Sequence, residues 1–124
     1  MASVSVAAGT LAVTLTVREK IAAAHGDVRV PLSAVRSVRA EPDALAALGG
    51  LRAPGAAVPG RAKIGVWRGQ GRRRFVVARR GVPAVCVTLK GARYDELIIS
   101  IEPAEQIAEQ IRASAARAAD RVRR

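Results

Sequence analysis

The sequence predicts a mainly β, α+β domain in which an antiparallel sheet of seven or eight short strands curls and is covered by a C-terminal helix. Between residues 3 and 101, apolar and polar residues alternate with a period of two in several runs, which is typical of strands with one buried face. Residues 103–122 instead place apolar side chains three or four positions apart, as an amphipathic helix does. A long antiparallel sheet curls and its open end needs a cover, so we expect the helix to close it.

The 124 residues fit one domain, residues 1–124, large enough to bury a single core. Aromatic residues make up only 2%, so the core must consist mainly of Val, Ile, Leu and Ala. Cys86 is the one cysteine, which excludes an internal disulfide and a cysteine-based metal site. No secretory leader and no apolar run of membrane-spanning length is present, so we expect a cytoplasmic protein, with peripheral attachment to a membrane left open. We expect no cofactor and no metal.

The first third of the chain alternates strictly and is broken by turn residues. A short helix or helical turn is indicated where Glu19, Lys20 and a run of alanines interrupt the alternation. Pro31 has no N–H for a central ladder and closes a short strand. The predicted elements are strands Ser3–Ala7, Thr10–Val17 and Val28–Val30, a helical turn Arg18–Ala24, and a turn at His25-Gly26-Asp27.

The middle of the chain contains the clearest hairpin. Two alternating runs flank Gly69-Gln70-Gly71, which is a turn composition. Phe75 is in phase with Val77, so both are expected to face the core. The predicted elements here are a turn at Ser33, strand Val35–Glu41, a short helix Ala44–Leu48, a loop Leu51–Gly60, the hairpin Ala62–Arg68 and Arg72–Arg79, and strands Val85–Lys90 and Glu96–Ile101.

The C-terminal helix is predicted from Pro103 to about Val122. Proline suits a first helical position, and Glu102 and Glu105 at the start complement the helix dipole. The predicted apolar stripe is Ile107, Ile111, Ala115, Ala118 and Val122.

Positive charge is concentrated in one stretch of the sequence. The formal net charge is +11, and residues 61–93 carry ten basic groups and no acidic one. A patch of one sign attracts polyanions. The predicted anion-binding residues are Arg61, Lys63, Arg68, Arg72, Arg73, Arg74, Arg79 and Arg80, with Trp67 as an interfacial aromatic beside them. The competing interpretation is that these arginines keep an edge hairpin soluble. Arg outnumbers Lys 18 to 3, which is typical of GC-rich bacterial genomes such as those of actinobacteria.

Three classes of anionic partner remain open. A membrane surface fits Trp67 next to arginines, because tryptophan favours the interfacial zone. An acidic protein segment could bind the hairpin or extend an exposed strand. Nucleic acid is the alternative, although single-strand binders usually stack bases on several aromatic side chains, and only Trp67 and Tyr94 are available. We expect a non-enzymatic binding or adaptor module, with an anionic membrane surface or an acidic protein segment as the leading partners.

No constellation of residues indicates catalysis. His25 is the single histidine and sits in a turn without a neighbouring nucleophile. The helix acids Glu102, Glu105 and Glu109 are explained as a solvated face. The glycines around the hairpin turn lack the Lys-Ser/Thr and the following helix of a phosphate-binding loop. We therefore expect no enzymatic activity.

Two stretches resemble the bacterial pleckstrin-homology-like domains. VRVPLSAVRSV (Val28–Val38) is similar to that family's strand, proline, turn and second strand. ELIISIEPAEQIAEQI (Glu96–Ile111) is similar to its last strand and capping helix. The resemblance implies a partly open, seven-stranded barrel with a C-terminal helix over one end, and a binding role towards lipid head groups, peptides or proteins. The family's phosphoinositide pattern, a Lys-x-Arg set in the first strand pair, has no counterpart, because Thr10–Val17 contains no basic residue.

Overall fold

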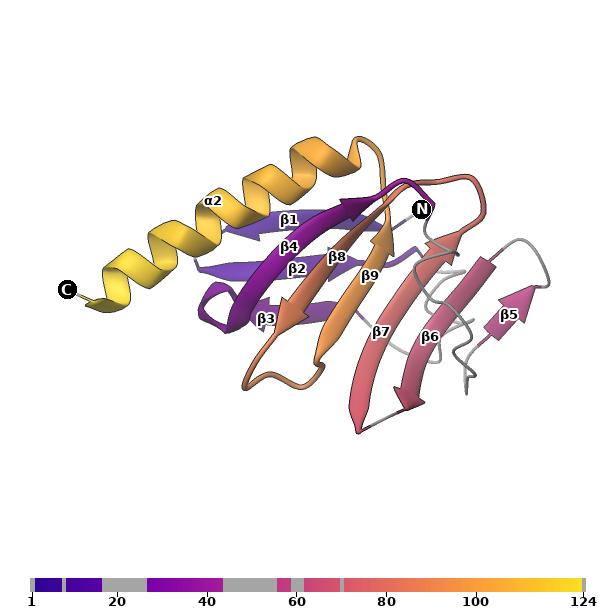
Figure 1. The fold of residues 1–124 in the computed structure, drawn as a ribbon, viewed down its shortest axis with the longest axis horizontal. Helices are drawn as coiled ribbons and strands as arrows, with labels where there is room; N and C mark the ends of the chain where they lie inside the picture. Colours follow the sequence, from indigo (N-terminus) through magenta and orange to yellow (C-terminus); the bar gives the residue numbers. More distant parts are fainter. Residues whose placement is uncertain are drawn as a thin grey trace.

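The computed structural model of the protein describes residues 2–7, 9–16, 27–43, 56–58, 62–69 and 71–123. These residues are mainly β, with an α-helix at the C-terminal end, which confirms the predicted fold class (Figure 1). The helical segments expected over 18–24 and 44–48 and the turn at His25 lie outside the described residues. Within the described part of the chain, no helix is both long enough and apolar enough to cross a bilayer.

The first strands form a three-stranded antiparallel sheet in the order β1-β2-β3. They are β1 (Ser3–Ala7), β2 (Thr10–Thr14) and β3 (Val28–Pro31). The second strand ends at Thr14 and not at the predicted Val17. The reason is local: the Leu15 N–H donates to a carboxylate oxygen of Asp27 at 2.8 Å, so it does not continue the ladder.

A 3-10 turn, η1 (Leu32–Ala34), leads into a six-stranded sheet in the order β4-β8-β9-β7-β6-β5. Its strands are β4 (Val35–Glu41), β5 (Ala56–Val58), β6 (Ala62–Gly69), β7 (Arg72–Arg79), β8 (Ala84–Leu89) and β9 (Glu96–Ser100). The predicted hairpin is confirmed as β6 and β7. The loop predicted over residues 51–60 is wrong in part, because β5 forms there and pairs with β6.

The expectation of a single, wholly antiparallel sheet is wrong, and the expected partly open barrel is not confirmed because the sheets do not close into one. The chain forms two separate sheets, and β9 pairs with β7 in parallel. A hairpin cannot join two parallel strands, so the chain does not pass directly from β7 to β9. It first forms β8 on the far side of β9 and then returns to form β9 between β8 and β7. The turn at η1 follows β3 and separates the three-stranded sheet from β4, the next strand in the chain. Alternation predicted the strands, but it does not specify which strands pair.

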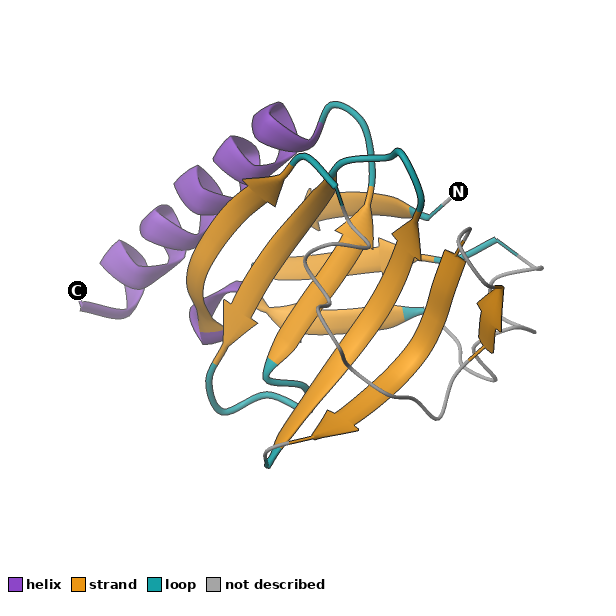
Figure 2. Cartoon of the chain, turned by 45° about the vertical axis from the view of Figure 1, so that its right-hand side comes forward, coloured by secondary structure: helices purple, strands orange, loops and turns teal. Residues whose placement is uncertain are grey.

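The main core lies between the two sheets, and α2 (Ala104–Arg123) runs along one side of them (Figure 2). Phe75 and Val77 from β7 face this core, as predicted, and both are 0% exposed. The helix contacts β4, β8 and η1, and its residues Ala104, Ala108 and Ile111 are buried in this core. The predicted stripe is confirmed at Ile111, which is buried, and at Ile107 and Ala118, which are half-buried and pack against this core. Ala115 is half-buried, and the side chain of Val122 lies outside the described residues.

A second apolar cluster covers the opposite face of the six-stranded sheet. Its members are Trp67, Val76, Ala78, Ala84, Cys86 and Ile98. The middle of this sheet is consequently buried on both faces, as its continuous apolar runs on β7 and β9 require.

Candidate functional site

The tip of the β6–β7 hairpin presents exposed arginines, as the sequence predicts. Arg72 and Arg73 begin β7 and are exposed, opposite Gly69 and Arg68 on β6. The turn contains Gly71 at φ +74°, a left-handed conformation that glycine adopts without strain. The core side chains of Phe75 and Val77 hold the strand that carries these cations.

Arg74, one of the predicted anion-binding residues, is half-buried and not exposed. Its Nε donates to a carboxylate oxygen of Glu96 at 3.0 Å, and the two side chains are only 13% and 18% exposed. The two residues are register neighbours on the parallel strands β7 and β9, which explains the contact. Because its charge is already compensated, Arg74 contributes little to an anion-binding surface.

Arg79 and Arg80 lie at the other end of β7 from Arg72. Seven strand steps of about 3.4 Å separate Arg72 from Arg79, roughly 24 Å in all. The predicted set of eight cations is therefore not one patch. Lys63 and Arg68 lie on β6, whose side chains at these positions are outside the description, and Arg61 is outside it entirely.

Trp67 is not an interfacial aromatic. It is 1% exposed and packs with the apolar cluster on the outer face of the six-stranded sheet. Trp67 shares this face with its register partner Arg74, because residues directly opposite each other on paired strands point to the same face. Phe75 and Tyr94 are also buried. No aromatic side chain among those described is free to insert into a bilayer or to stack on a base.

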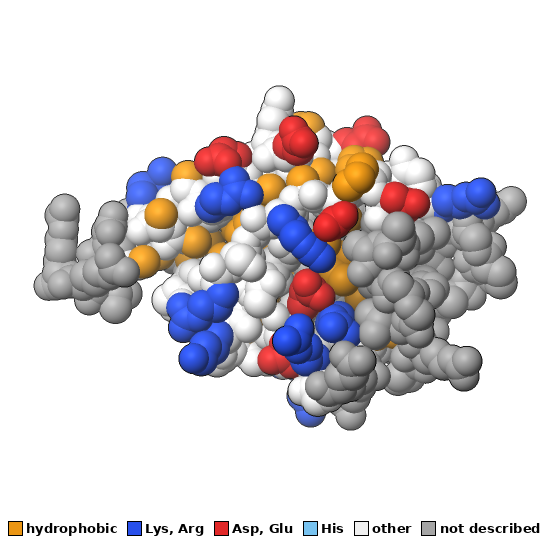
Figure 3. All heavy atoms as spheres, in the orientation of Figure 1, with side chains coloured by type: hydrophobic (Ala, Val, Ile, Leu, Met, Phe, Trp, Pro, Cys, Tyr) orange, Lys and Arg blue, Asp and Glu red, His pale blue; other side chains and the backbone are white. Residues whose placement is uncertain are grey.

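Cations from two further segments join the hairpin tip. Lys90 and Arg93 are exposed in the connection between β8 and β9, and Arg36 is exposed near the start of β4. We call the set Arg36, Arg72, Arg73, Lys90 and Arg93 the cationic end. Figure 3 shows Lys and Arg side chains spread over the face it displays, several of them towards its lower edge with acidic side chains between them.

Backbone hydrogen bonds fix these segments at one end of the six-stranded sheet. Asp95 N–H donates to the Arg73 carbonyl at 2.8 Å, and the Asp95 carboxylate accepts the Arg73 N–H, also at 2.8 Å. Lys90 N–H donates to the Ala34 carbonyl at 2.9 Å, directly before β4. The β6–β7 turn, the β8–β9 connection and the start of β4 are thereby joined.

Arg73 and Arg93 both act on the side chain of Tyr94. Burial raises the pKa of the Tyr94 hydroxyl, and the guanidinium groups of Arg93 and Arg73 both act to lower it. Arg93 also lies over the Tyr94 ring, 5.6 Å from its centroid, and the ring packs against Phe75. A buried aromatic pair therefore supports the cations from beneath.

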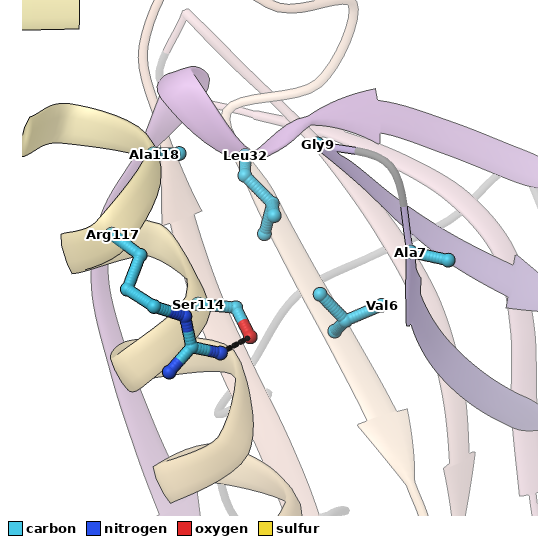
Figure 4. Close-up of a pocket in the computed structure, with 7 residues that line it drawn as sticks. All are labelled: Val6, Ala7, Gly9, Leu32, Ser114, Arg117 and Ala118. Carbon is cyan, nitrogen blue, oxygen red and sulfur yellow. Dashed lines mark hydrogen bonds between the residues drawn. The ribbon is translucent and has the colours of Figure 1, made fainter. Parts of the chain in front are cut away.

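A separate cavity of about 270 Å³ opens between α2 and the three-stranded sheet. Figure 4 shows Val6 and Leu32 on one side of it and Ser114 and Arg117 on the other. The Arg117 guanidinium donates to the Ser114 hydroxyl at 3.1 Å. The described residues that line this cavity supply one guanidinium, one hydroxyl and apolar walls, and no acid–base pair.

The described residues hold no group of three or more His, Cys, Asp or Glu side chains that could bind a metal. Cys86 is buried, and burial raises the pKa of its thiol to about 11, with Arg39 opposing that shift and Glu96 and Glu41 adding to it. At neutral pH the thiol is protonated and is a poor nucleophile.

Comparison with family models, curated proteins and solved structures finds no match for the chain. The cationic end is consequently interpreted from its own geometry and charge.

Proposed function

We propose that the protein is a non-enzymatic binding module that attaches to an anionic partner through the cationic end. The observation that carries the proposal is the convergence of exposed cations from three chain segments at one end of one sheet. Around them, the Glu96 carboxylate is already engaged by Arg74, and Asp95 is engaged by the Arg73 backbone. The five cations therefore outnumber the nearby acids.

The burial of Trp67 favours an acidic protein segment over a membrane or a nucleic acid. Without an exposed aromatic side chain, attachment to a bilayer or to unpaired bases would depend on charge alone. Each basic group near an anionic surface contributes about 1 kcal/mol, so five contribute about 5 kcal/mol and support only weak, reversible binding. An acidic protein segment adds directional contacts from carboxylates to guanidinium groups.

The resemblance to bacterial pleckstrin-homology-like domains belongs to this proposal. It is supported by the strand, 3-10 turn and strand around Pro31, and by a helix that follows the last strand. Two separate sheets and the parallel β7–β9 pair depart from the barrel that the family implies.

The proposal is tested with three probes: a polyglutamate peptide, vesicles of phosphatidylserine and phosphatidylcholine in equal parts, and a short duplex DNA. We expect the peptide to bind most tightly, with affinity that falls as salt rises. The variant Arg72→Gln/Arg73→Gln/Lys90→Gln should bind about 100-fold less tightly, because three groups of about 1 kcal/mol each are lost.

The matched control is Arg29→Gln/Arg80→Gln/Arg117→Gln, which removes three exposed charges from other parts of the molecule. It should reduce affinity much less. Equal loss in both variants would show that only the net charge matters and would refute a localised site. If the protein bound none of the probes at low salt, the localised site would also be refuted. If vesicles or DNA bound more tightly than the peptide, they would take the place of the acidic segment as the partner.

A further inference from the structure

The strand β4 forms one edge of the six-stranded sheet. A side chain of α2, Arg112, donates from its Nη2 to the Val38 carbonyl at 2.8 Å. That carbonyl therefore points away from β8, towards the helix. In an antiparallel strand the N–H and C=O of one residue point to the same side, and alternate residues repeat the direction. Val38 and Ala40 thus present their backbone groups along the free edge.

A groove separates this edge from α2. Arg112 crosses it and divides it into cavities of about 410 Å³ and about 500 Å³. The lining residues are Val35, Arg36, Ser37, Val38, Arg39 and Ala40 from β4, with Glu105, Gln106, Ala108, Glu109, Arg112, Ala115 and Ala116 from α2. From Val35 to Ala40 the edge is about 17 Å long at roughly 3.4 Å per residue. From Glu105 to Ala116 the helix rises about the same distance at 1.5 Å per residue. The groove accommodates an extended segment of about five residues.

Charge is distributed unevenly along the groove. In the half that begins at Val35, the described lining residues include Arg36 and Arg112 and no acidic residue. In the other half, Glu105 and Glu109 accompany Arg39, which itself pairs with Glu41 at 3.4 Å. The positive half adjoins the cationic end, because Arg36 belongs to both. A chain that follows β4 would therefore leave the groove directly over the exposed arginines and Lys90.

We infer that this groove binds an extended segment of a partner protein, which adds to β4 as a further strand and places an acidic run over the cationic end. The inference rests on the proposed function and specifies how the acidic segment is held. Main-chain hydrogen bonds to Val38 and Ala40 supply affinity, and the acidic run determines the direction of binding. A second copy of this chain is a poor occupant, because it would bring a further net charge of +11.

Arg112 changes partner in this mode of binding. In the free protein, its guanidinium bonds both the Val38 carbonyl and the Glu109 carboxylate. An added strand donates its own N–H to Val38, and Arg112, which is half exposed, remains paired with Glu109. The arginine therefore satisfies the edge carbonyl when no segment is bound.

The experiment uses two synthetic peptides, each with an alternating Val-Thr segment and a run of three glutamates, at the N-terminus in one and at the C-terminus in the other. Two orientations are needed because parallel and antiparallel addition reverse the direction of the peptide. We expect one of them to bind the 124-residue chain and to slow amide hydrogen exchange at Val38 and Ala40. The same peptide with alternate amides N-methylated, which removes strand hydrogen bonds, should bind at least 10-fold less tightly.

The matched variants are Ala116→Phe and Ala113→Phe. Both positions are exposed on α2, but only Ala116 lines the groove. Ala116→Phe should weaken peptide binding at least 10-fold, and Ala113→Phe should leave it unchanged. The inference would be overturned if the two variants had equal effects or if the N-methylated peptide bound as tightly as the unmodified one. It would also be overturned if dimer formation protected the Val38 and Ala40 amides from exchange without any peptide.

The two proposals fail in different ways. If polyglutamate binding is lost in Arg72→Gln/Arg73→Gln/Lys90→Gln while Ala116→Phe binds the strand peptide normally, the cationic end stands and the groove does not. If Ala116→Phe abolishes strand-peptide binding and the triple variant has no effect on polyglutamate, the groove stands without the cationic end.

Discussion

Ile111→Ala tests whether α2 is part of the core or only an appendage to the sheets. The Ile111 side chain is 1% exposed and belongs to the main core. The change removes three carbon groups, each contributing about 0.8 kcal/mol on burial, and leaves a cavity in the main core. Alanine has the higher helix propensity, which offsets a few tenths of a kcal/mol. We expect a loss of about 3 kcal/mol in the free energy of unfolding.

The assay is urea denaturation followed by circular dichroism, with Ile107→Ala as the matched control. Ile107 lies one helical turn earlier and is half-buried, so its truncation should cost about half as much. Since native proteins are stable by roughly 5–15 kcal/mol, a loss of 3 kcal/mol is easily measured. A loss below about 1 kcal/mol for Ile111→Ala, or an equal loss for both variants, would refute the packing argument.

Two further changes test the six-stranded sheet. Arg74→Gln leaves the half-buried Glu96 carboxylate uncompensated and should lower the free energy of unfolding, measured by urea denaturation, by about 1–3 kcal/mol. The double variant Arg74→Met/Glu96→Leu removes both charges and should recover most of that loss. A double variant as unstable as Arg74→Gln would contradict this. For Cys86, burial raises the pKa of the folded thiol to about 11 from its ordinary value of 9.0. Above pH 9 the unfolded state therefore loses its proton first, and the free energy of unfolding falls as the pH rises to about 11. The free energy of unfolding of Cys86→Ala should fall less over that range, and parallel pH profiles for the two proteins would show that the thiol is not the cause.

Local elements could be predicted because their signals are local. Strand β4 begins at Val35 and ends at Glu41 as predicted, since Pro31 and the turn at Ser33 separate it from β3. The hairpin was predictable from alternation around a glycine-rich turn. The helix was predictable from its apolar spacing, although it begins at Ala104, one residue after the predicted Pro103.

Pairing between distant segments could not be predicted in the same way. Nothing in the sequence around Glu96 indicates that its strand lies parallel to the one that carries Arg74. The sequence also did not associate Arg36 with the hairpin tip, because only the order of the strands in the folded sheet places the two at the same end. Lys90 and Arg93 were within the basic stretch and could have been included.

The burial of Trp67 did have a sequence signal. Phe75, Val76, Val77 and Ala78 form a continuous apolar run, which is typical of a strand buried on both faces. A strand paired with that run places Trp67 on the second buried face, among side chains such as Ile98. A Trp67→Ala change would therefore create a cavity in the protein, and it cannot serve as a test of membrane insertion.

The position of β9 has a consequence for synthesis of the protein on the ribosome. This strand lies between β8 and β7, yet it is the last strand of the described chain to be made. At about 5–20 residues per second, the interval between completion of β7 at Arg79 and of β9 at Ser100 is roughly 1–4 seconds. During that interval the inner edge of β7 has no partner, although Phe75 and its apolar neighbours are already present. The nascent chain therefore exposes an unpaired, apolar strand edge for seconds, and this is the period in which chaperone binding would matter most.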